Sequence, residues 1–487
     1  MKPVQRRRCI MDSIWSRTCH IPRREKLRGE VRSQAAVIGA GMAGILIASA
    51  LQEAGLEVKV LEARRIAGGQ SRNTTAKITA QHGLIYRRLI DDVGMDRARQ
   101  YAQANQEAVD SLRRIVADRG IDCDFEERSA YVYGNGLEQL ERELTAARML
   151  GLPASFVERP ELPAAAAGAV AFSNQAQFNP LKFIGSLSQE MKIYEESPVK
   201  EIRENRLITL EGWLEAEHII FACHYPFVNF PGMYFTRMHQ ERSYVLALEV
   251  ERPLEGMWIS AEKGGYSLRN YKGMQFIGGE NHRAGENREG GCYDRLRRKA
   301  AELFPGSREL ACWSAQDCIT ADGIPYIGGF SPDRPNWYVA TGFNKWGMSS
   351  SMVSAKLIRS MVLGEKPACA EVFDPGRFDV DTVAGAVAEG VQAVKGYAKR
   401  FFQIPAKAAA GIAPGQGGIV FLEEEKLGVY RDGEGRLHPV DIRCPHLGCQ
   451  LEWNSDELSW DCPCHGSRFD AYGHIISGPA QEDAGGR

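Results

Sequence analysis

The chain has 487 residues, of which 44% are hydrophobic, and its formal net charge is −2. This length predicts roughly two to four domains with a substantial core, and the balanced charge argues against nucleic acid as a partner. Eight of the twelve cysteines lie outside residues 444–464 and follow no framework spacing. They favour buried, reduced thiols and a cytoplasmic protein.

Residues 1–33 form a basic N-terminal arm, with ten Lys or Arg against three Asp or Glu. Arg6, Arg7 and Arg8 are consecutive, but no apolar core or small-residue cleavage site follows them. The sequence therefore does not predict a twin-arginine export signal. We expect a poorly ordered arm that packs partly on the next domain.

A dinucleotide-binding fingerprint follows the arm. The apolar run 34–38 predicts a strand, residues 39–44 read G-x-G-x-x-G, and residues 45–54 predict a helix. A second apolar run, 57–61, ends in Glu62. In such a fold the glycines let the backbone approach a pyrophosphate at the helix N-terminus, and the acid binds a ribose. The predicted binding residues here are Gly39, Gly41, Met42, Ala43, Gly44, Glu62 and Arg64.

Only one such fingerprint is found in the sequence. Gly134-Asn135-Gly136 lacks a third glycine, and Gly415 to Gly418 opens no amphipathic helix followed by a strand and an acid. A flavin reductase driven by NADH or NADPH normally needs two dinucleotide sites. A single site favours a tightly held flavin that an organic substrate reduces directly.

The middle of the chain adds a family resemblance. Phe178-Asn179-Pro180 opens an amphipathic segment, Asp322 to Gly328 forms a glycine-containing turn, Trp337 to Thr341 predicts a strand, and Gly342 to Met348 opens a helix. In this order the segments resemble the glycine and D-amino acid oxidase family, whose FAD domain is assembled from separated stretches. The resemblance implies FAD as cofactor and adds these binding residues: Val199, Gly323, Gly342, Gly347 and Met348.

The same resemblance implies the fold and its division. We expect an α/β, Rossmann-like FAD-binding domain with an inserted α+β substrate domain over residues 34–380. The FAD-binding segments would be 34–84, 175–235 and 311–365. The substrate segments would be 85–174 and 236–310.

Three residues are candidates for catalysis. Lys345, at a helix N-terminus, would stabilise the negative charge of a reduced flavin, unless it is an ordinary surface lysine. Family members commonly bind a substrate carboxylate with an Arg or Lys and a Tyr, which suggests Arg269 and Tyr266, with His282 nearby. A structural role is the alternative for each. His82 is a weak candidate for covalent flavin attachment, against the default of a core histidine.

A linker is predicted between the two parts of the chain. From Asp381 to about Lys407, valines and other apolar residues recur at spacings of three and four, which predicts an amphipathic helix within a linker at 381–411. We expect it to dock on its own protein rather than on a membrane. The apolar stretch 35–51 is too short and too rich in glycine to span a bilayer, so no transmembrane segment is predicted.

The C-terminal region, 412–487, contains the pattern C-x-H-x15-C-x2-H. Two thiolates and two imidazoles, from Cys444, His446, Cys462 and His465, form the ligand set of a Rieske 2Fe-2S centre. A zinc site usually groups like ligands and needs no spare cysteines. Short strands predict a small all-β domain.

Two further cysteines, Cys449 and Cys464, lie one step outside the ligand loops, where a disulfide could tie the loops together. The region resembles the disulfide-containing branch of the Rieske family. High-potential Rieske members have a Tyr two residues after the Ser that matches Ser467, and this chain has Phe469 there. Because one hydrogen-bond donor is missing, we expect a lower cluster potential.

The whole chain resembles FAD-dependent oxidoreductases that carry a C-terminal Rieske domain. The resemblance implies oxidation of a small amine or amino acid, with electrons passing from FAD through the cluster to an external acceptor. A reductase running in the opposite direction and a non-enzymatic electron carrier remain alternatives. A Rieske oxygenase is disfavoured, because its mononuclear iron needs two more histidines after the cluster and only His474 follows.

Overall fold

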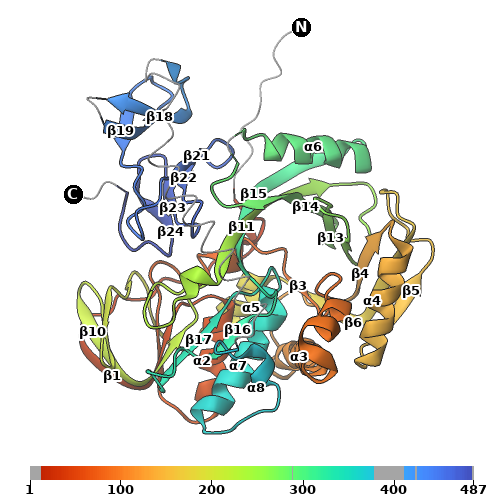
Figure 1. Cartoon of the computed structure of the whole chain (residues 1–487), viewed down its shortest axis with the longest axis horizontal. Helices are drawn as coiled ribbons and strands as arrows, with labels where there is room; N and C mark the ends of the chain where they lie inside the picture. The colour runs from red at the N-terminus through yellow and green to blue at the C-terminus, as the bar shows by residue number, and fades with distance from the viewer. Residues whose placement is uncertain (1–11, 288, 378–410, 423–424, 485–487) are drawn as a thin grey trace.

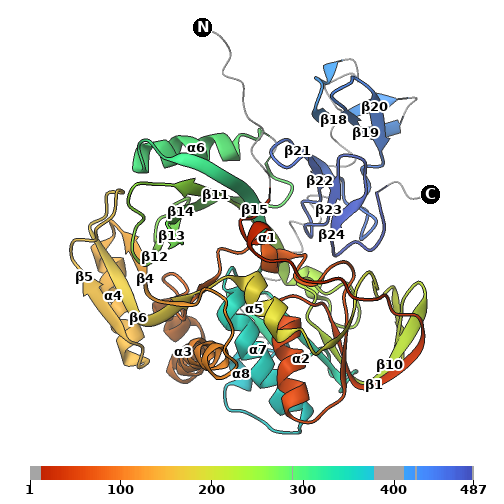
Figure 2. The same cartoon turned by 180° about the vertical axis from the view of Figure 1, so that it is seen from behind.

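The computed structural model describes residues 12–287, 289–377, 411–422 and 425–484. Residues 12–377 form a body of two β-sheets and their helices, and the C-terminal domain lies against it (Figures 1 and 2). The predicted linker helix at 381–411 lies outside the described residues apart from its last position.

The first sheet consists of β1 (Gly29–Ile38), β2 (Val58–Leu61), β7 (Lys192–Tyr194), β8 (Glu201–Arg203), β9 (Arg206–Ile208), β10 (Gly212–Phe221), β16 (Tyr326–Gly329) and β17 (Trp337–Thr341). Its order is β16-β17-β10-β1-β2-β7, with β8 and β9 beside β10. β1 pairs in parallel with β2 and β10. Along β1, Val37 joins the core on one face and Ile38 the core on the other, as the two-residue repeat of a strand requires.

Helices pack on this sheet and on the second sheet described below. They are α1 (Trp15–Thr18), α2 (Met42–Glu53), α3 (Tyr86–Asp118), α4 (Leu137–Met149), α5 (Pro180–Leu187), α6 (Cys292–Leu303), α7 (Gly347–Val362) and α8 (Ala370–Phe373), with the 3-10 turns η1 (Gln70–Arg72) and η2 (Tyr234–Thr236). α2 packs on α7, and α7 also contacts α3. Among the described helices, none combines the length and the apolar character needed to cross a membrane.

The second sheet contains β3 (Lys77–Ile78), β4 (Glu126–Gly134), β5 (Ala154–Val157), β6 (Gly168–Gln177), β11 (Met238–Glu249), β12 (Met257–Ser260), β13 (Ser267–Tyr271), β14 (Met274–Arg283) and β15 (Arg308–Thr320). Its order is β15-β11-β14-β13-β12-β4-β6-β3, with β5 beside β6. The sequence assigns residues 311–320 to an FAD-binding segment, but β15 pairs with β11 along its length and so belongs to this sheet.

The two faces of the second sheet have different neighbours. One face, here called the outer face, packs on α6: Leu246 and Leu268 share a core with Leu296 of that helix. The opposite, inner face contributes Val245 and Tyr271 to the large core that contains α2 and α7. The inner face therefore looks toward the first sheet.

The described part of the N-terminal arm is packed. Trp15 is fully buried, its ring lies 4.7 Å from that of Tyr271, and its Nε1 donates to Thr74 O at 2.7 Å. β1 begins at Gly29, inside the predicted arm, because Gly29 to Arg32 pair with Gly212 to Glu215. Residues 12–28 thus cover one side of the body.

The C-terminal domain joins a three-stranded sheet to a four-stranded antiparallel sheet. The strands are β18 (Gln416–Leu422), β19 (Glu425–Arg431), β20 (Leu437–Val440), β21 (Glu452–Asn454), β22 (Ser459–Asp461), β23 (Arg468–Asp470) and β24 (Ile475–Ser477). The first predicted ligand loop lies before β21, and the second links β22 to β23.

Candidate cofactor sites

The two ligand loops of the C-terminal domain have matching turns. Gly448 N donates to Cys444 O at 2.8 Å, and Gly466 N donates to Cys462 O at 2.9 Å. Both glycines are left-handed, with φ of 76° and 78°, which an L side chain rarely adopts. Each ligand cysteine is therefore followed by the same tight turn.

These turns bring two sulfurs and two imidazoles together. Cys444 and Cys462 are buried free thiols, and the rings of His446 and His465 lie 4.9 Å apart. Hydrogen bonds from Cys462 and from the Ser467 hydroxyl lower the pKa of Cys444. The same hydrogen bond raises the pKa of Cys462, so Cys444 is the thiol of the pair that more readily becomes the thiolate that a metal binds.

The hydrogen bonding of His446 also suits an iron ligand. Its Nε2 lies 2.7 Å from Oδ1 of Asn229, and an amide oxygen only accepts, so Nε2 carries the proton. Its Nδ1 is buried and has no hydrogen-bond partner among the described residues. Because buried imidazole nitrogens are normally satisfied, the free Nδ1 fits a bond to a metal.

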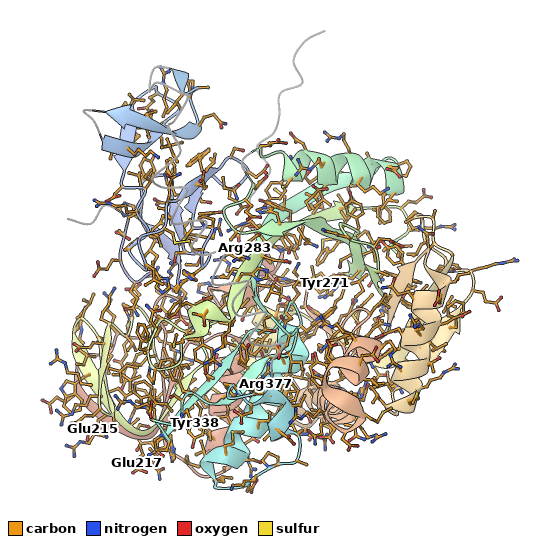
Figure 3. All side chains as sticks on the ribbon, in the orientation of Figure 1. Glu215, Glu217, Tyr271, Arg283, Tyr338 and Arg377 are labelled. Carbon is orange, nitrogen blue, oxygen red and sulfur yellow. A yellow bond between two sulfur atoms is a disulfide. The ribbon has the colours of Figure 1, made fainter. Side chains whose placement is uncertain are left out.

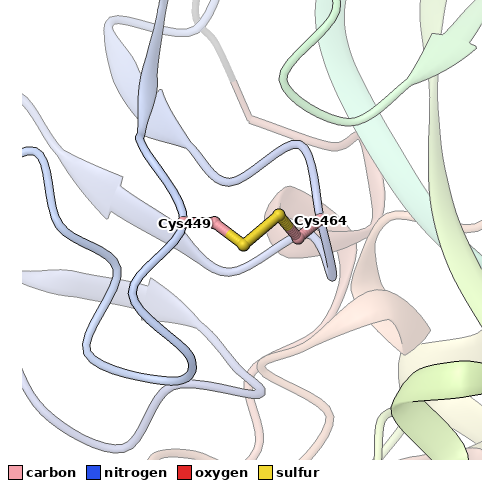
Figure 4. The surroundings of a disulfide bond; sticks show 2 residues. All are labelled: Cys449 and Cys464. Atoms are coloured by element: carbon pink, nitrogen blue, oxygen red, sulfur yellow. A yellow bond between two sulfur atoms is a disulfide. The ribbon is translucent and has the colours of Figure 1, made fainter. Parts of the chain in front are cut away.

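Cys449 and Cys464 form a disulfide that joins the two ligand loops (Figure 4). Their Sγ atoms also lie within 4.8 Å of Cys462 Sγ. Disulfide sulfurs offer no thiolate, so only Cys462 of these three can be a ligand. The four predicted ligands fit a 2Fe-2S cluster, and the disulfide holds their loops together.

The predicted dinucleotide loop links β1 to α2. A Cβ on Gly39 would lie 2.6 Å from Ala222 O, and one on Gly44 would lie 1.8 Å from Gly39 O. Neither position has room for a side chain. α2 begins at Met42, so its first-turn amides face the loop, as a pyrophosphate requires.

Glu62 lies at the end of β2 beside this loop. Its carboxylate accepts from Ala40 N at 2.8 Å and from Arg64 N at 2.9 Å, while burial raises its pKa. The segment before Val199 contacts the same point, because Ser197 N donates to Glu62 O at 2.9 Å. The Arg64 side chain points elsewhere and donates to Ile475 O of the C-terminal domain at 2.9 Å.

One residue of this site carries no signal in the sequence. The Ser71 hydroxyl accepts from Met42 N at 2.9 Å, so it lies at the first turn of α2. A serine on an unremarkable stretch resembles no motif. Only the fold of η1 over the loop places it there.

The remaining predicted FAD residues lie around two turns. Gly342 has a φ of 69°, and a Cβ there would meet Thr320 at 2.3 Å, while Gly347 and Met348 begin α7. Gly323, with a φ of 74°, leaves space for the Arg88 guanidinium. Arg377, which Figure 3 labels, clamps this second turn by donating to Asp322 Oδ2 at 2.8 Å.

Lys345 is ion-paired rather than freely solvated. Its Nζ lies 2.8 Å from Oε2 of Glu241 on β11. Hydrogen bonding from His239, together with Lys345, lowers the pKa of Glu241 to about 2. Burial raises the pKa of the neighbouring Asp317 to about 6. Lys345 thus stands among acidic groups on the inner face.

Arg269 is a buried clamp. Its side chain is fully buried, and Nη1 donates to the carbonyl oxygens of Thr75 and Ala76. Burial lowers its pKa to about 9. Its guanidinium lies 5.5 Å from the Trp15 ring. Arg269 therefore holds the segment that leads from the dinucleotide loop to β3.

Tyr266 lies on the opposite face of the sheet from Arg269. Its hydroxyl donates to Glu280 at 3.4 Å, and Lys299 of α6 lies over its ring. His282 is also on this outer face, bonded to the Tyr244 hydroxyl at 3.1 Å. The structure does not bring Arg269, Tyr266 and Lys345 together, because strand neighbours alternate between faces.

His82 is a satisfied core histidine. Its Nδ1 lies 2.7 Å from the Tyr101 hydroxyl, and its Nε2 lies 2.9 Å from Thr79 O. Burial lowers its pKa to about 3. Since both nitrogens are engaged, the geometry does not favour flavin attachment there.

A cavity of about 460 Å³ lies beside Lys345, lined by residues that include His82, Arg88, His239, Asn344 and Trp346. This volume is in the range of small-molecule sites. The inner face holds one more unusual group, Lys77, whose pKa burial lowers to about 7.

The cluster loops dock on the outer face of β11 and β15. Gln240 Nε2 donates to His465 O at 2.6 Å, and Gln316 Nε2 donates to Gly466 O at 2.7 Å. The backbone N of Gln316 in turn donates to Gln70 Oε1 at 2.8 Å. Gln70 belongs to η1, next to the dinucleotide loop, so a short chain of polar contacts joins the two cofactor sites.

Buried charges anchor the docking. Arg242 of β11 is fully buried and lies 3.3 Å from Asp461 and 3.6 Å from Glu457 of the C-terminal domain. Arg468 reaches the same two carboxylates, at 3.4 and 3.1 Å. Burial alone would raise the pKa values of Asp461 and Glu457, but the two guanidinium groups hold both below their ordinary values.

Comparison with known families agrees with these sites. The FAD dependent oxidoreductase family matches residues 34–361, and the Rieske [2Fe-2S] domain matches residues 403–484. The chain belongs to the FAD-dependent oxidoreductase family and carries a C-terminal Rieske domain. It is an enzyme that binds FAD and a 2Fe-2S cluster, as predicted from the sequence.

Three similar proteins cover different parts of the chain. A Rieske 2Fe-2S iron-sulfur protein of Bacillus subtilis, YhfW, is 34% identical over 489 residues, covering 96% of each chain. Cytochrome b6-f complex iron-sulfur subunit 2 of Trichormus variabilis is 49% identical over 49 residues, 10% of this chain and 28% of that protein. Glycine oxidase from Geobacillus kaustophilus has a TM-score of 0.60 at 21% identity, covering 72% of this chain and 100% of its own. The last comparison confirms the predicted fold class.

Proposed function

We propose that this enzyme oxidises a small amine or amino acid at a C-N bond and passes the electrons from FAD through the Rieske cluster to an external acceptor. When bound, FAD takes up the two electrons of the substrate, and the cluster accepts and releases electrons singly. The fold shared with glycine oxidase supports the substrate class.

One observation carries the electron route. The ligand loop that holds His465 rests on β11 and β15, and Gln316 contacts both that loop and Gln70 beside the dinucleotide loop. A cluster docked on the wall of the flavin domain suits direct transfer within one chain. The buried ion pairs of Arg242 favour a lasting contact over a transient encounter.

The residues of the inner face would serve the substrate. The cavity near Arg88 and Trp346 has the size for a small amine or amino acid. Lys345, beside the N-terminus of α7, keeps its proposed role of favouring negative charge on a reduced flavin. Arg269 would act indirectly by holding the segment at 75–76. The role of Tyr266 stays a prediction, because its hydroxyl bonds Glu280 on the outer face, away from the cavity.

The test is anaerobic mixing of the purified enzyme with a panel of amines and amino acids. Bleaching of the flavin absorbance followed by reduction of the cluster would support the proposal. Rapid bleaching by NADH or NADPH, or flavin reduction only after an external donor has reduced the cluster, would favour the reductase alternative. No bleaching by any compound would favour an electron carrier.

A cytoplasmic location also stays a proposal. Cys123, Cys292 and Cys312 are buried free thiols, and burial raises the pKa of Cys123 to about 12. Such thiols are poorly reactive and occur in reducing compartments. Localisation of a tagged chain by cell fractionation would test this.

A further inference from the structure

We infer that Asn229, a residue of the flavin domain, is part of the cluster site and positions the ligand His446. Its Oδ1 lies 2.7 Å from His446 Nε2, and it comes from the loop between β10 and η2, far from the Rieske region in sequence. The inference concerns the cluster alone. It depends neither on the substrate nor on the direction of electron flow.

The backbone of Asn229 is hydrogen-bonded within its own domain. Its carbonyl accepts from Met233 N at 2.8 Å, which closes the loop on itself. Tyr234, which follows Met233, is buried, and its hydroxyl donates to Phe330 O at 3.0 Å. The flavin domain therefore holds the loop from which the Asn229 side chain reaches His446.

The effect on His446 is specific. Because the amide oxygen accepts the Nε2 proton, the imidazole is fixed in the tautomer whose other nitrogen, Nδ1, is free. The hydrogen bond also fixes the plane of the ring. Outer hydrogen-bond partners of this kind orient a metal ligand and increase its basicity.

The other ligand loop is fixed from the same domain. Gln240 and Gln316 bond the carbonyl oxygens of His465 and Gly466. A Cβ on Gly466 would lie 2.7 Å from Cβ of Gln240, so the two backbones approach closely. The cluster site is thus completed by two domains, and its redox properties should depend on their docking.

The direction in which the cluster potential should change follows from the strength of the hydrogen-bond acceptor at Nε2. A stronger acceptor at Nε2 moves electron density onto the imidazole and favours the oxidised, more positive cluster. Asn229→Asp would replace a neutral acceptor by a charged one, whose hydrogen bond is roughly twice as strong. We expect the equilibrium to shift about tenfold toward the oxidised cluster, equivalent to about 59 mV for one electron. Asn229→Ala removes the acceptor and should shift it the other way.

The experiment is a redox titration of the cluster in the full chain with both cofactors bound. Asn336→Asp is the matched control, because Asn336 is an exposed residue of the same domain. The inference predicts the order Ala above Asn above Asp in potential, with the control unchanged. Equal potentials, or the opposite order, would overturn it.

A second measurement probes the contact itself and is made on chains that retain the cluster, because its loss would itself expose Nδ1 of His446. Diethyl pyrocarbonate modifies accessible imidazoles, and mass spectrometry can compare His446 with His474, whose side chain is 70% exposed. In the wild-type chain His446 should react more slowly than His474. Asn229→Ala should accelerate only His446, about fivefold for the loss of a bond of about 1 kcal/mol. Equal reactivity of the two residues in the wild-type chain would refute the contact.

Discussion

The cluster site and the flavin site differ in how the chain builds them. All four proposed cluster ligands lie within residues 444–465, on two loops with matching turns and a shared disulfide. The flavin site draws on segments from Gly39 to Met348, and its glycines are set by remote neighbours: Gly39 by Ala222, and Gly342 by Thr320. Local turns therefore make one site, and long-range packing makes the other.

The two domains also touch at the cluster site. The ligand loops contact the flavin domain at Gln240 and Gln316 on the outer face of the second sheet, and at Asn229 in the loop between β10 and η2. The flavin domain thus helps to hold the ligand loops of the C-terminal domain in place. Changes in either site should then have separable effects on cofactor binding but joint effects on redox behaviour.

The largest expected effect comes from changing the cluster ligands, which should remove the cluster and leave FAD in place. Replacing His446 or His465 by Ala should abolish the Rieske absorption and electron paramagnetic resonance spectra while FAD stays bound. The reason is that each imidazole is one of only two on its iron. His474→Ala is the control, because His474 is exposed and bonds Asp483. A normal Rieske spectrum in either ligand variant would show that the ligands are misassigned.

The second prediction is the converse, a change in the flavin site that leaves the cluster in place. Gly44→Ala should lose FAD and retain the cluster, because the new Cβ would lie 1.8 Å from Gly39 O. Gly329→Ala, at the end of β16 in the same domain, is the control, because a Cβ there meets nothing within 4 Å. Flavin and iron contents of the purified chains would be measured. Full FAD content in Gly44→Ala would contradict the proposed pyrophosphate loop.

The compact site was the easier one to predict from sequence. Its four ligands and two disulfide cysteines lie within a short span, so ligand type and spacing are enough to predict the cluster. The strand, glycine turn and helix around Gly39 to Gly44 are likewise local, and the family comparison confirms FAD. Local hydrogen bonds and turn geometry determine both features.

The substrate side could not be predicted in the same way. Tyr266, just before β13, and Arg269, within it, are three residues apart in the sequence but lie on opposite faces of the sheet, since side chains alternate along an extended chain. Lys77, Glu241 and Lys345 reach the inner face from three separate segments. No local pattern predicts such meetings, because tertiary pairing of distant strands determines them.

The third prediction concerns the joint between the sites. Arg242→Met should weaken the docked C-terminal domain by about 3 kcal/mol, because it leaves Asp461 and Glu457 buried with one cation fewer. Thermal unfolding followed by the circular dichroism of the cluster would measure it. Arg308→Met, which breaks an exposed pair with Glu249, should cost less than about 1 kcal/mol. Equal losses in both variants would mean that Arg242 does not hold the joint.

The same anchor predicts a pH dependence. The pKa values of Asp461 and Glu457 are lowered in the folded state, so their contribution to stability is complete above their unfolded values of about 4. It is lost as the pH falls through the lower, folded values. The wild-type chain should lose stability on acidification below about pH 4, and Arg242→Met should lose less.

The smallest expected effect is a change in the reduction potential of the cluster, caused by substitutions within the C-terminal domain. The Ser467 hydroxyl bonds the Cys444 sulfur and accepts from Ala480 N at 2.9 Å, so it is oriented to stabilise the more negative, reduced cluster. Ser467→Ala should lower the potential by about 40 mV, the equivalent of one hydrogen bond of about 1 kcal/mol. Phe469 is fully buried in the same core as Cys444 and Cys462, and Phe469→Tyr should raise the potential by adding a donor. Protein-film voltammetry on the full chain would compare both variants with Phe230→Tyr, which changes an exposed ring. An unchanged or lower potential in Phe469→Tyr would mean that residue 469 does not face the cluster, and that the potential is set by Ser467 and by the flavin domain.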